Sequence, residues 1–167
     1  MNKKGFTLLE LIVVMIILGS IMLLSLPNIS SMIDKNRRTA YINDAKKMIK
    51  LSRYKFNLAS EGKPAELYCK LYTLADLDRS ELDVPPQGGT YDASLSYVYV
   101  KYNKTSATYE YHVQLLEKYK VGTKYYYRGI ISTLEENLNY ENSKMKYVTN
   151  PYETNAYFTR NLTCTTI

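Results

Sequence analysis

Residues 3–33 read KKGFTLLELIVVMIILGSIMLLSLPNISSMI, two basic residues followed by a long apolar stretch. No charged residue occurs from Leu11 to Ile33, a run of 23 positions. As an α-helix this run would extend about 34 Å, enough to cross the hydrocarbon core of a bilayer. The stretch is too long for an ordinary secretory signal, and no small-residue cleavage site follows it. Its simplest interpretation is an N-terminal membrane anchor.

Glu10 interrupts the apolar segment, one helical turn after Phe6. A carboxylate at the centre of a membrane costs about 2.5–3.5 kcal/mol on insertion scales, and the cost is lower nearer the end, where Glu10 lies. Even there, the charge calls for a partner. If the chain is cut between Gly5 and Phe6, the new α-amine of Phe6 can neutralise Glu10, either in the same copy or in a neighbouring one.

A short motif precedes the apolar run. The residues Lys3-Lys4-Gly5-Phe6-Thr7-Leu8-Leu9-Glu10, followed by the aliphatic stretch, resemble the class III signal of type IV prepilins and pseudopilins. The resemblance implies a leader peptide at residues 1–5 and cleavage after Gly5 by the prepilin peptidase. It also implies N-methylation of the new N-terminus, Phe6, and makes Glu10 the carboxylate that pairs with the Phe6 amine during assembly.

The same resemblance implies an α+β fold, the type IV pilin fold. In this fold a long N-terminal α-helix packs on an antiparallel β-sheet, here expected to have about four strands. Residues 6–33 would form the transmembrane and filament-core helix, with a kink at Pro27, because proline removes a helical hydrogen bond. Residues 34–167 would hold the amphipathic half of the helix and the globular β-sheet head domain.

The pattern after residue 34 agrees with this division. One face collects apolar residues at helical spacing, namely Ile42, Ala45, Ile49, Phe56 and Ala59. Gly62 and Pro64 mark the expected end of the helix. Short helical turns are expected over 64–82, and a turn at Pro85–Gly89. Strands are expected at Ser96–Asn103, Thr108–Leu116, Lys124–Ile131, Met145–Thr149 and Ala156–Ile167, with a short helix near Leu134–Tyr140.

Cys69 and Cys164 are the two cysteines of the chain. An even number in an exported domain favours one disulfide bond, and the alternative is two reduced, buried thiols. The bond would close a loop of 94 residues. Loop-entropy arguments give a loop of that size roughly 4–5 kcal/mol of stabilisation. We expect the disulfide because the N-terminal motif places this domain outside the membrane.

A basic and aromatic cluster lies between residues 118 and 128. Its candidate surface-binding residues are Lys118, Lys120, Lys124, Tyr125, Tyr126, Tyr127 and Arg128. Cationic side chains contact phosphates and tyrosines stack on bases, so DNA is one candidate ligand and a glycan is another. The favoured interpretation is that the tyrosines build the faces of a half-exposed sheet. The net charge of +6, or +4 without the two leader lysines, does not by itself indicate nucleic acid.

No catalytic or metal-binding constellation stands out. His112, the single histidine, falls on the polar face of an expected strand, and two distant cysteines lack the spacing of zinc ligands. No glycine-rich phosphate loop occurs. We therefore expect no enzyme activity, no cofactor and no metal.

The expected function is structural, as a major or minor pilin of a type IV pilus. Such a subunit resides in the cell membrane before assembly and at the cell surface afterwards, with a role in adhesion, twitching motility or surface attachment. Its expected partners are other pilin subunits, the prepilin peptidase, the assembly ATPase and the platform membrane protein. The alternatives are a pseudopilin of a type II secretion or DNA-uptake system, and a membrane-anchored binding protein that never polymerises.

Overall fold

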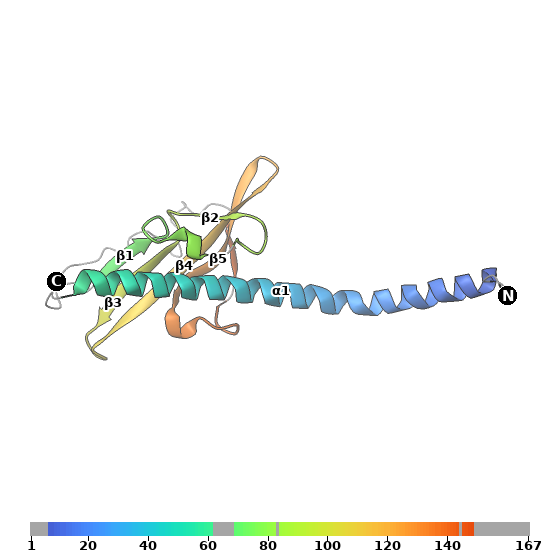
Figure 1. Ribbon diagram of the computed structural model, residues 1–167, viewed down its shortest axis with the longest axis horizontal. Coiled ribbons are helices and arrows are strands. Elements are labelled where there is room, and N and C mark those ends of the chain that lie inside the picture. The colour runs from blue at the N-terminus through green and yellow to red at the C-terminus, as the bar shows by residue number, and fades with distance from the viewer. Residues whose placement is uncertain (1–6, 62–68, 83, 144, 149–167) are drawn as a thin grey trace, which may run out of the picture. The chain divides into compact units, whose positions relative to one another are not determined.

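The structure is a computed structural model, which describes residues 7–61, 69–82, 84–143 and 145–148, without the side chains of residues 23–28, 132 and 148 (Figure 1). The chain divides into two compact units, Met1–Asn36 and Arg37–Ile167. The long helix α1 (Leu8–Ser60) contributes to both of them. A long N-terminal helix followed by an antiparallel sheet is the expected α+β arrangement, so the predicted fold class is confirmed.

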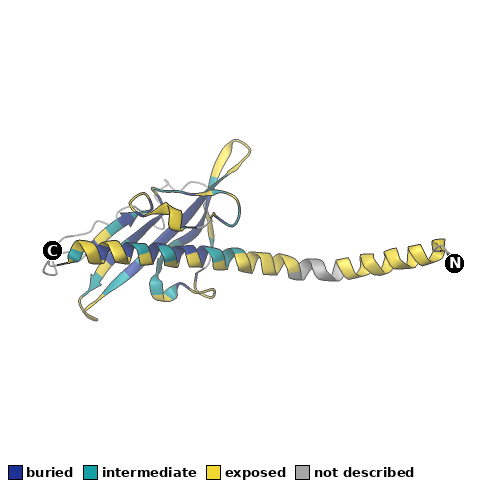
Figure 2. Ribbon diagram, viewed as in Figure 1, coloured by how far each residue is buried: buried dark blue, intermediate teal, exposed yellow. Residues whose placement is uncertain are grey.

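The described part of the first unit starts at residue 7 and consists mainly of the beginning of α1. Every described side chain from residue 7 to residue 22 is exposed (Figure 2). The hydroxyl of Ser20 donates to the carbonyl oxygen of Ile16 at 2.8 Å, so this polar group is satisfied within the apolar stretch. The helix continues through position 27. The side chain of Pro27 lies outside the described residues, and the kink stays a prediction.

In the second unit, α1 is amphipathic. Its buried positions recur every three or four residues and comprise Tyr41, Ile42, Asp44, Ala45, Met48, Ile49, Ser52 and Phe56. The predicted face is confirmed at Ile42, Ala45, Ile49 and Phe56. Ala59, which was assigned to the same face, is exposed. One side of this part of the helix therefore requires a covering surface, and the sheet supplies it.

The sheet of the second unit has six strands among the described residues, all paired antiparallel. They are β1 (Cys69–Thr73), β2 (Thr90–Tyr91), β3 (Tyr97–Asn103), β4 (Thr108–Val121), β5 (Lys124–Leu134) and β6 (Lys146–Val148). Their spatial order is β1-β3-β4-β5-β6, and β2 pairs with β4. Two short 3-10 helices complete the unit, η1 (Arg79–Glu81) and η2 (Glu135–Asn137).

The strands β3, β4, β5 and β6 agree with the sequence pattern, whereas β1 and β2 were not predicted, so the sheet has six strands among the described residues instead of about four. The expected helical turns over 64–82 are wrong at β1, which pairs along β3 with Leu71 opposite Tyr99. The leucine spacing suggested a helix. A strand here instead pairs with the edge of β3 and satisfies the backbone groups of β3 that a helix at this position would leave unpaired. The short helix near Leu134–Tyr140 is reduced to η2. The expected strand Ala156–Ile167 lies outside the described residues.

The main core lies between α1 and one face of the sheet (Figure 2). Its fully buried sheet residues include Val98, Val100, Val113, Leu115 and Ile130. The ring of Phe56 meets that of Tyr109 edge-on, with 4.8 Å between the centroids. A second, smaller cluster contains Leu95, Leu116 and Tyr127. Parts of β4 and β5 are therefore buried on both faces.

The pairing of β4 with β5 contains one irregularity. The register shifts between Val113 and Leu115, and Gly129 of β5 lies beside the shift with a φ of 152°. A Cβ atom at Gly129 would lie 1.9 Å from the carbonyl oxygen of Leu115. Glycine is required here both by the backbone conformation and by the close approach of β4.

We expect Gly129→Ala to lower the free energy of unfolding by about 3 kcal/mol or more, because a backbone clash adds to the strain of a positive φ. Gly122→Ala is the matched control, since Gly122 also has a positive φ but a Cβ there meets no atom within 4 Å. We expect Gly122→Ala to lower the free energy of unfolding by only about 1 kcal/mol. Chemical denaturation of the two variants measures the difference, and equal losses would contradict the role given to the contact with β4.

Candidate functional site

The start of α1 is held by a reciprocal pair of residues. The backbone N–H and the hydroxyl of Thr7 each donate to Oε2 of Glu10 at 3.0 Å. In return, the backbone N–H of Glu10 donates to Oγ1 of Thr7 at 3.3 Å. This is a capping box, which satisfies donors that the first helical turn would otherwise leave open. Sequence reasoning gave Glu10 only the Phe6 amine as a partner, although the spacing Thr-x-x-Glu is itself a signal for the cap.

Glu10 keeps capacity for a second partner. Among the described residues, no donor is hydrogen-bonded to its other carboxylate oxygen, Oε1. Gly5 and Phe6 lie outside the described residues, so cleavage between them and the pairing of Glu10 with the new amine stay predictions. The capping box and the predicted pairing use different oxygens and are compatible.

The apolar side chains after Glu10 have no cover in the first unit. Leu11, Met15 and Ile16 are 57%, 69% and 64% exposed. A helix that is apolar all round must be covered by some other apolar surface. A transmembrane helix was expected at residues 6–33. Among the residues that the structure describes, no helix has an apolar run sufficient to span a membrane.

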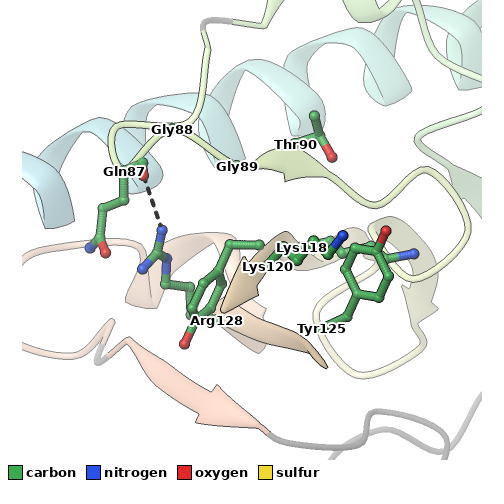
Figure 3. Close-up of a pocket in the computed structure, with 9 residues that line it drawn as sticks. Gln87, Gly88, Gly89, Thr90, Lys118, Lys120, Tyr125 and Arg128 are labelled. Atoms are coloured by element: carbon green, nitrogen blue, oxygen red, sulfur yellow. Dashed lines mark hydrogen bonds between the residues drawn. The ribbon is translucent and has the colours of Figure 1, made fainter. Parts of the chain in front are cut away.

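A hollow of about 570 Å³ lies in the second unit (Figure 3). It is bordered by the turn at 87–89, by Thr90 of β2 and by the hairpin of β4 and β5. The side chains of the hairpin that line it are Lys118, Tyr119, Lys120, Tyr125 and Arg128. The hollow therefore contains part of the basic and aromatic cluster predicted from the sequence.

Two lysines and one tyrosine of the hollow form a group (Figure 3). The Nζ atom of Lys118 lies 4.5 Å from the centre of the Tyr125 ring, and that of Lys120 lies 5.9 Å from it. The strand register explains the grouping, since Lys120 is directly opposite Tyr125. The electron-rich ring attracts both ammonium groups and limits where they can move.

Arg128 has a different role because its charge is paired. Its Nε and Nη2 atoms donate to the two carboxylate oxygens of Glu117 at 2.9 and 2.8 Å. Glu117 is fully buried, and its Oε1 also accepts the backbone N–H of Gly89 at 2.7 Å. Burial lowers the pKa of Arg128, but the hydrogen bonds and charge of Glu117 outweigh it and hold that pKa above its ordinary value. The pair therefore ties the turn to the sheet.

The predicted surface set is thus divided by the structure. Lys118, Lys120 and Tyr125 come together in the hollow, whereas Tyr127 is buried in the small core cluster. Tyr126 stacks on Tyr119, with 5.8 Å between ring centroids, and does not line the hollow. Lys124 is exposed outside the hollow. Sequence reasoning missed Glu117, because its pairing with Arg128 is visible only once the strand register is known.

His112 and Cys69 complete the list of candidate residues. Burial lowers the pKa of His112, and Glu110, whose carboxylate lies 3.9 Å from Nε2, opposes this shift only in part. The imidazole is therefore neutral at pH 7. No cluster of three potential ligands for a metal ion occurs among the described residues. Cys69 is buried on β1 and Cys164 lies outside the described residues, so the disulfide stays a prediction.

Comparison with known proteins concerns the N-terminal segment. Residues 1–26 match a family model described as the prokaryotic N-terminal methylation motif. This motif is the class III signal of type IV pilins and pseudopilins, so the resemblance inferred from Lys3 to Glu10 is confirmed. No curated protein and no solved structure matches the chain. The motif supports a type IV pilin or pseudopilin, and the α+β arrangement is consistent with the pilin fold.

Removing one partner of the buried pair should destabilise the second unit. Arg128→Met leaves the Glu117 carboxylate buried without its counter-charge, and we expect it to lower the free energy of unfolding by about 3–5 kcal/mol. The double variant Glu117→Gln with Arg128→Met removes both charges and should lose less than Arg128→Met alone. Denaturation of the wild type, both single variants and the double variant measures the coupling. If the loss of free energy of unfolding in the double variant equals the sum of the losses in the two single variants, the result would contradict a pairing of the two charges.

Proposed function

We propose that this chain, which carries the N-terminal signal of type IV pilins and pseudopilins, is a structural subunit of a type IV pilus. It would be made as a prepilin, cleaved after Gly5 by the prepilin peptidase and N-methylated at Phe6. It would reside in the cell membrane and then be extracted into a filament at the cell surface. The observation that carries the proposal is the match of residues 1–26 to the methylation motif.

The exposed apolar helix supports assembly. Burial of a single Leu, Ile, Val or Met side chain is worth about 1.5–3 kcal/mol, and the described side chains of residues 11–18 are all of these types. Lipid or the same helix of other subunits would cover them. Cohesion of the filament would then come from helix packing, with the assembly ATPase and the platform membrane protein driving the transfer from membrane to filament.

Glu10 would set the register of this packing. When the helix is covered by other helices, the Thr7 donors are neutral and leave the charge of the carboxylate uncompensated. The α-amine of Phe6 in a neighbouring subunit would supply the missing charge at Oε1. The capping box would meanwhile orient the carboxylate through Oε2.

The second unit would form the head of the subunit. It holds its own core between α1 and the sheet, which supports a domain that stays folded at the cell surface. A role of the filament in adhesion, twitching motility or surface attachment belongs to this proposal, as does a subunit without enzyme activity. A pseudopilin of a secretion or DNA-uptake system shares the same signal, and the amount of the protein in purified filaments separates the two.

Two substitutions at Glu10 and one at Thr7 test the assembly role. Glu10→Gln preserves the capping box, which accepts Gln at this position, but removes the charge. We expect Glu10→Ala and Glu10→Gln each to lower incorporation into filaments at least about tenfold, as expected for the loss of one charge pair in a dry environment. Quantitative immunoblots of sheared filaments and of membranes measure incorporation and membrane level, which should stay unchanged.

Thr7→Val is the matched control, because it removes the side-chain half of the capping box and leaves the charge in place. It should assemble nearly as well as the wild type. Loss of assembly in Thr7→Val with normal assembly in Glu10→Gln would show that only the cap matters. Normal assembly in all three variants would contradict the role given to the Glu10 charge, and absence of the wild type itself from sheared filaments would indicate a membrane-anchored binding protein that does not polymerise.

A further inference from the structure

The hollow between β2, β4 and β5 holds an excess of positive charge. Among the described residues, no carboxylate pairs with Lys118 or Lys120. The carboxylate of Glu117, next to Lys118 in the chain, is already neutralised by Arg128. Both ammonium groups lie within 6 Å of the centre of one ring, at 4.5 and 5.9 Å, so the hollow carries two like charges that repel each other. An anion placed in the hollow would relieve that repulsion.

The two rings that line the hollow, Tyr119 and Tyr125, differ in how far other side chains occupy them. Tyr119 has the guanidinium of Arg128 at 4.0 Å from its centre and stacks with Tyr126. Tyr125 has the two lysine ammonium groups near its ring, but its side chain is 52% exposed. A nucleobase gains its affinity for such a site by stacking on an open aromatic face. Because Tyr119 is engaged, the hollow offers a base only the single ring of Tyr125, whereas its two cations favour a ligand bound by charge and hydrogen bonds.

The lining of the hollow is otherwise polar. Thr90 and Gln87 also border the hollow, Thr90 on the side of the lysines and Gln87 at the end beside Arg128 (Figure 3). A concave site of about 570 Å³ is of the size that accepts a small ligand or a few units of a polymer. A duplex would present its phosphates on a convex surface, which suits a flat or raised basic patch better than a hollow.

We propose that this hollow binds an acidic glycan, with Lys118 and Lys120 contacting a carboxylate of the sugar. Tyr125 positions the two ammonium groups, and Thr90 and Gln87 hydrogen-bond the sugar hydroxyls. The buried pair of Glu117 and Arg128 holds the turn at 87–89 against the sheet and so keeps the hollow open. The site lies wholly within the second unit and does not depend on filament assembly.

The test uses the full-length protein in detergent micelles and hexagalacturonate as the acidic probe. Isothermal titration measures the Kd. Lys118→Ala with Lys120→Ala should raise the Kd at least about tenfold and reduce its dependence on salt, because the counter-charges of the carboxylate are lost. Lys118→Gln with Lys120→Gln, which removes the charges but keeps long polar side chains, should raise the Kd in the same way, and it controls for a folding defect in the alanine variant.

The matched control is Lys70→Ala with Lys101→Ala, which removes the same charge from exposed positions on β1 and β3. Its Kd should stay close to that of the wild type. Equal losses in the control and in the hollow variants would overturn the proposal, since they would reflect net charge alone. Tighter binding of a hexadeoxynucleotide than of hexagalacturonate would overturn it in favour of nucleic acid. If neutral maltohexaose binds with the same Kd as hexagalacturonate, the result would contradict the role given to the lysines.

Discussion

The helix α1 changes along its length from apolar on every side to amphipathic. Side chains of residues 7–22 are exposed on every side of the helix, whereas from Tyr41 onward the helix has one buried face. The second part finds its cover within the chain, in the sheet. The first part has no cover within its own unit, and the proposed subunit would cover it with lipid or with the same helix of other copies. One helix thus serves two separate purposes.

In the second unit, a buried pair of charges fixes a turn. Glu117 and Arg128 are opposite each other across β4 and β5, and Glu117 also binds the backbone of Gly89. A Cβ at Gly89 would lie 2.3 Å from Oε1 of Glu117, so only glycine permits this contact. The same arrangement removes Arg128 from the surface and leaves Lys118 and Lys120 as the cations of the hollow.

Local patterns in the sequence predicted the elements that are defined locally. Helical spacing located the buried face at Ile42, Ala45 and Ile49, and alternation located β3, β4 and β5. The pattern failed at β1, where leucine spacing suggested a helix and strand pairing decided otherwise. It could not reveal that Arg128 is paired, because its partner becomes a neighbour only through the register of two strands. Thr7 was missed although the spacing of a capping box was present.

The intact mass of the protein purified from its own cells tests the central claim most directly. The account predicts a chain that begins at Phe6 and carries one additional methyl group on its N-terminus. Such a mass requires both the cut after Gly5 and the modification that the motif at residues 1–26 specifies. A full-length chain, or a chain cut after the apolar segment, would contradict the account and leave an anchored or secreted binding domain.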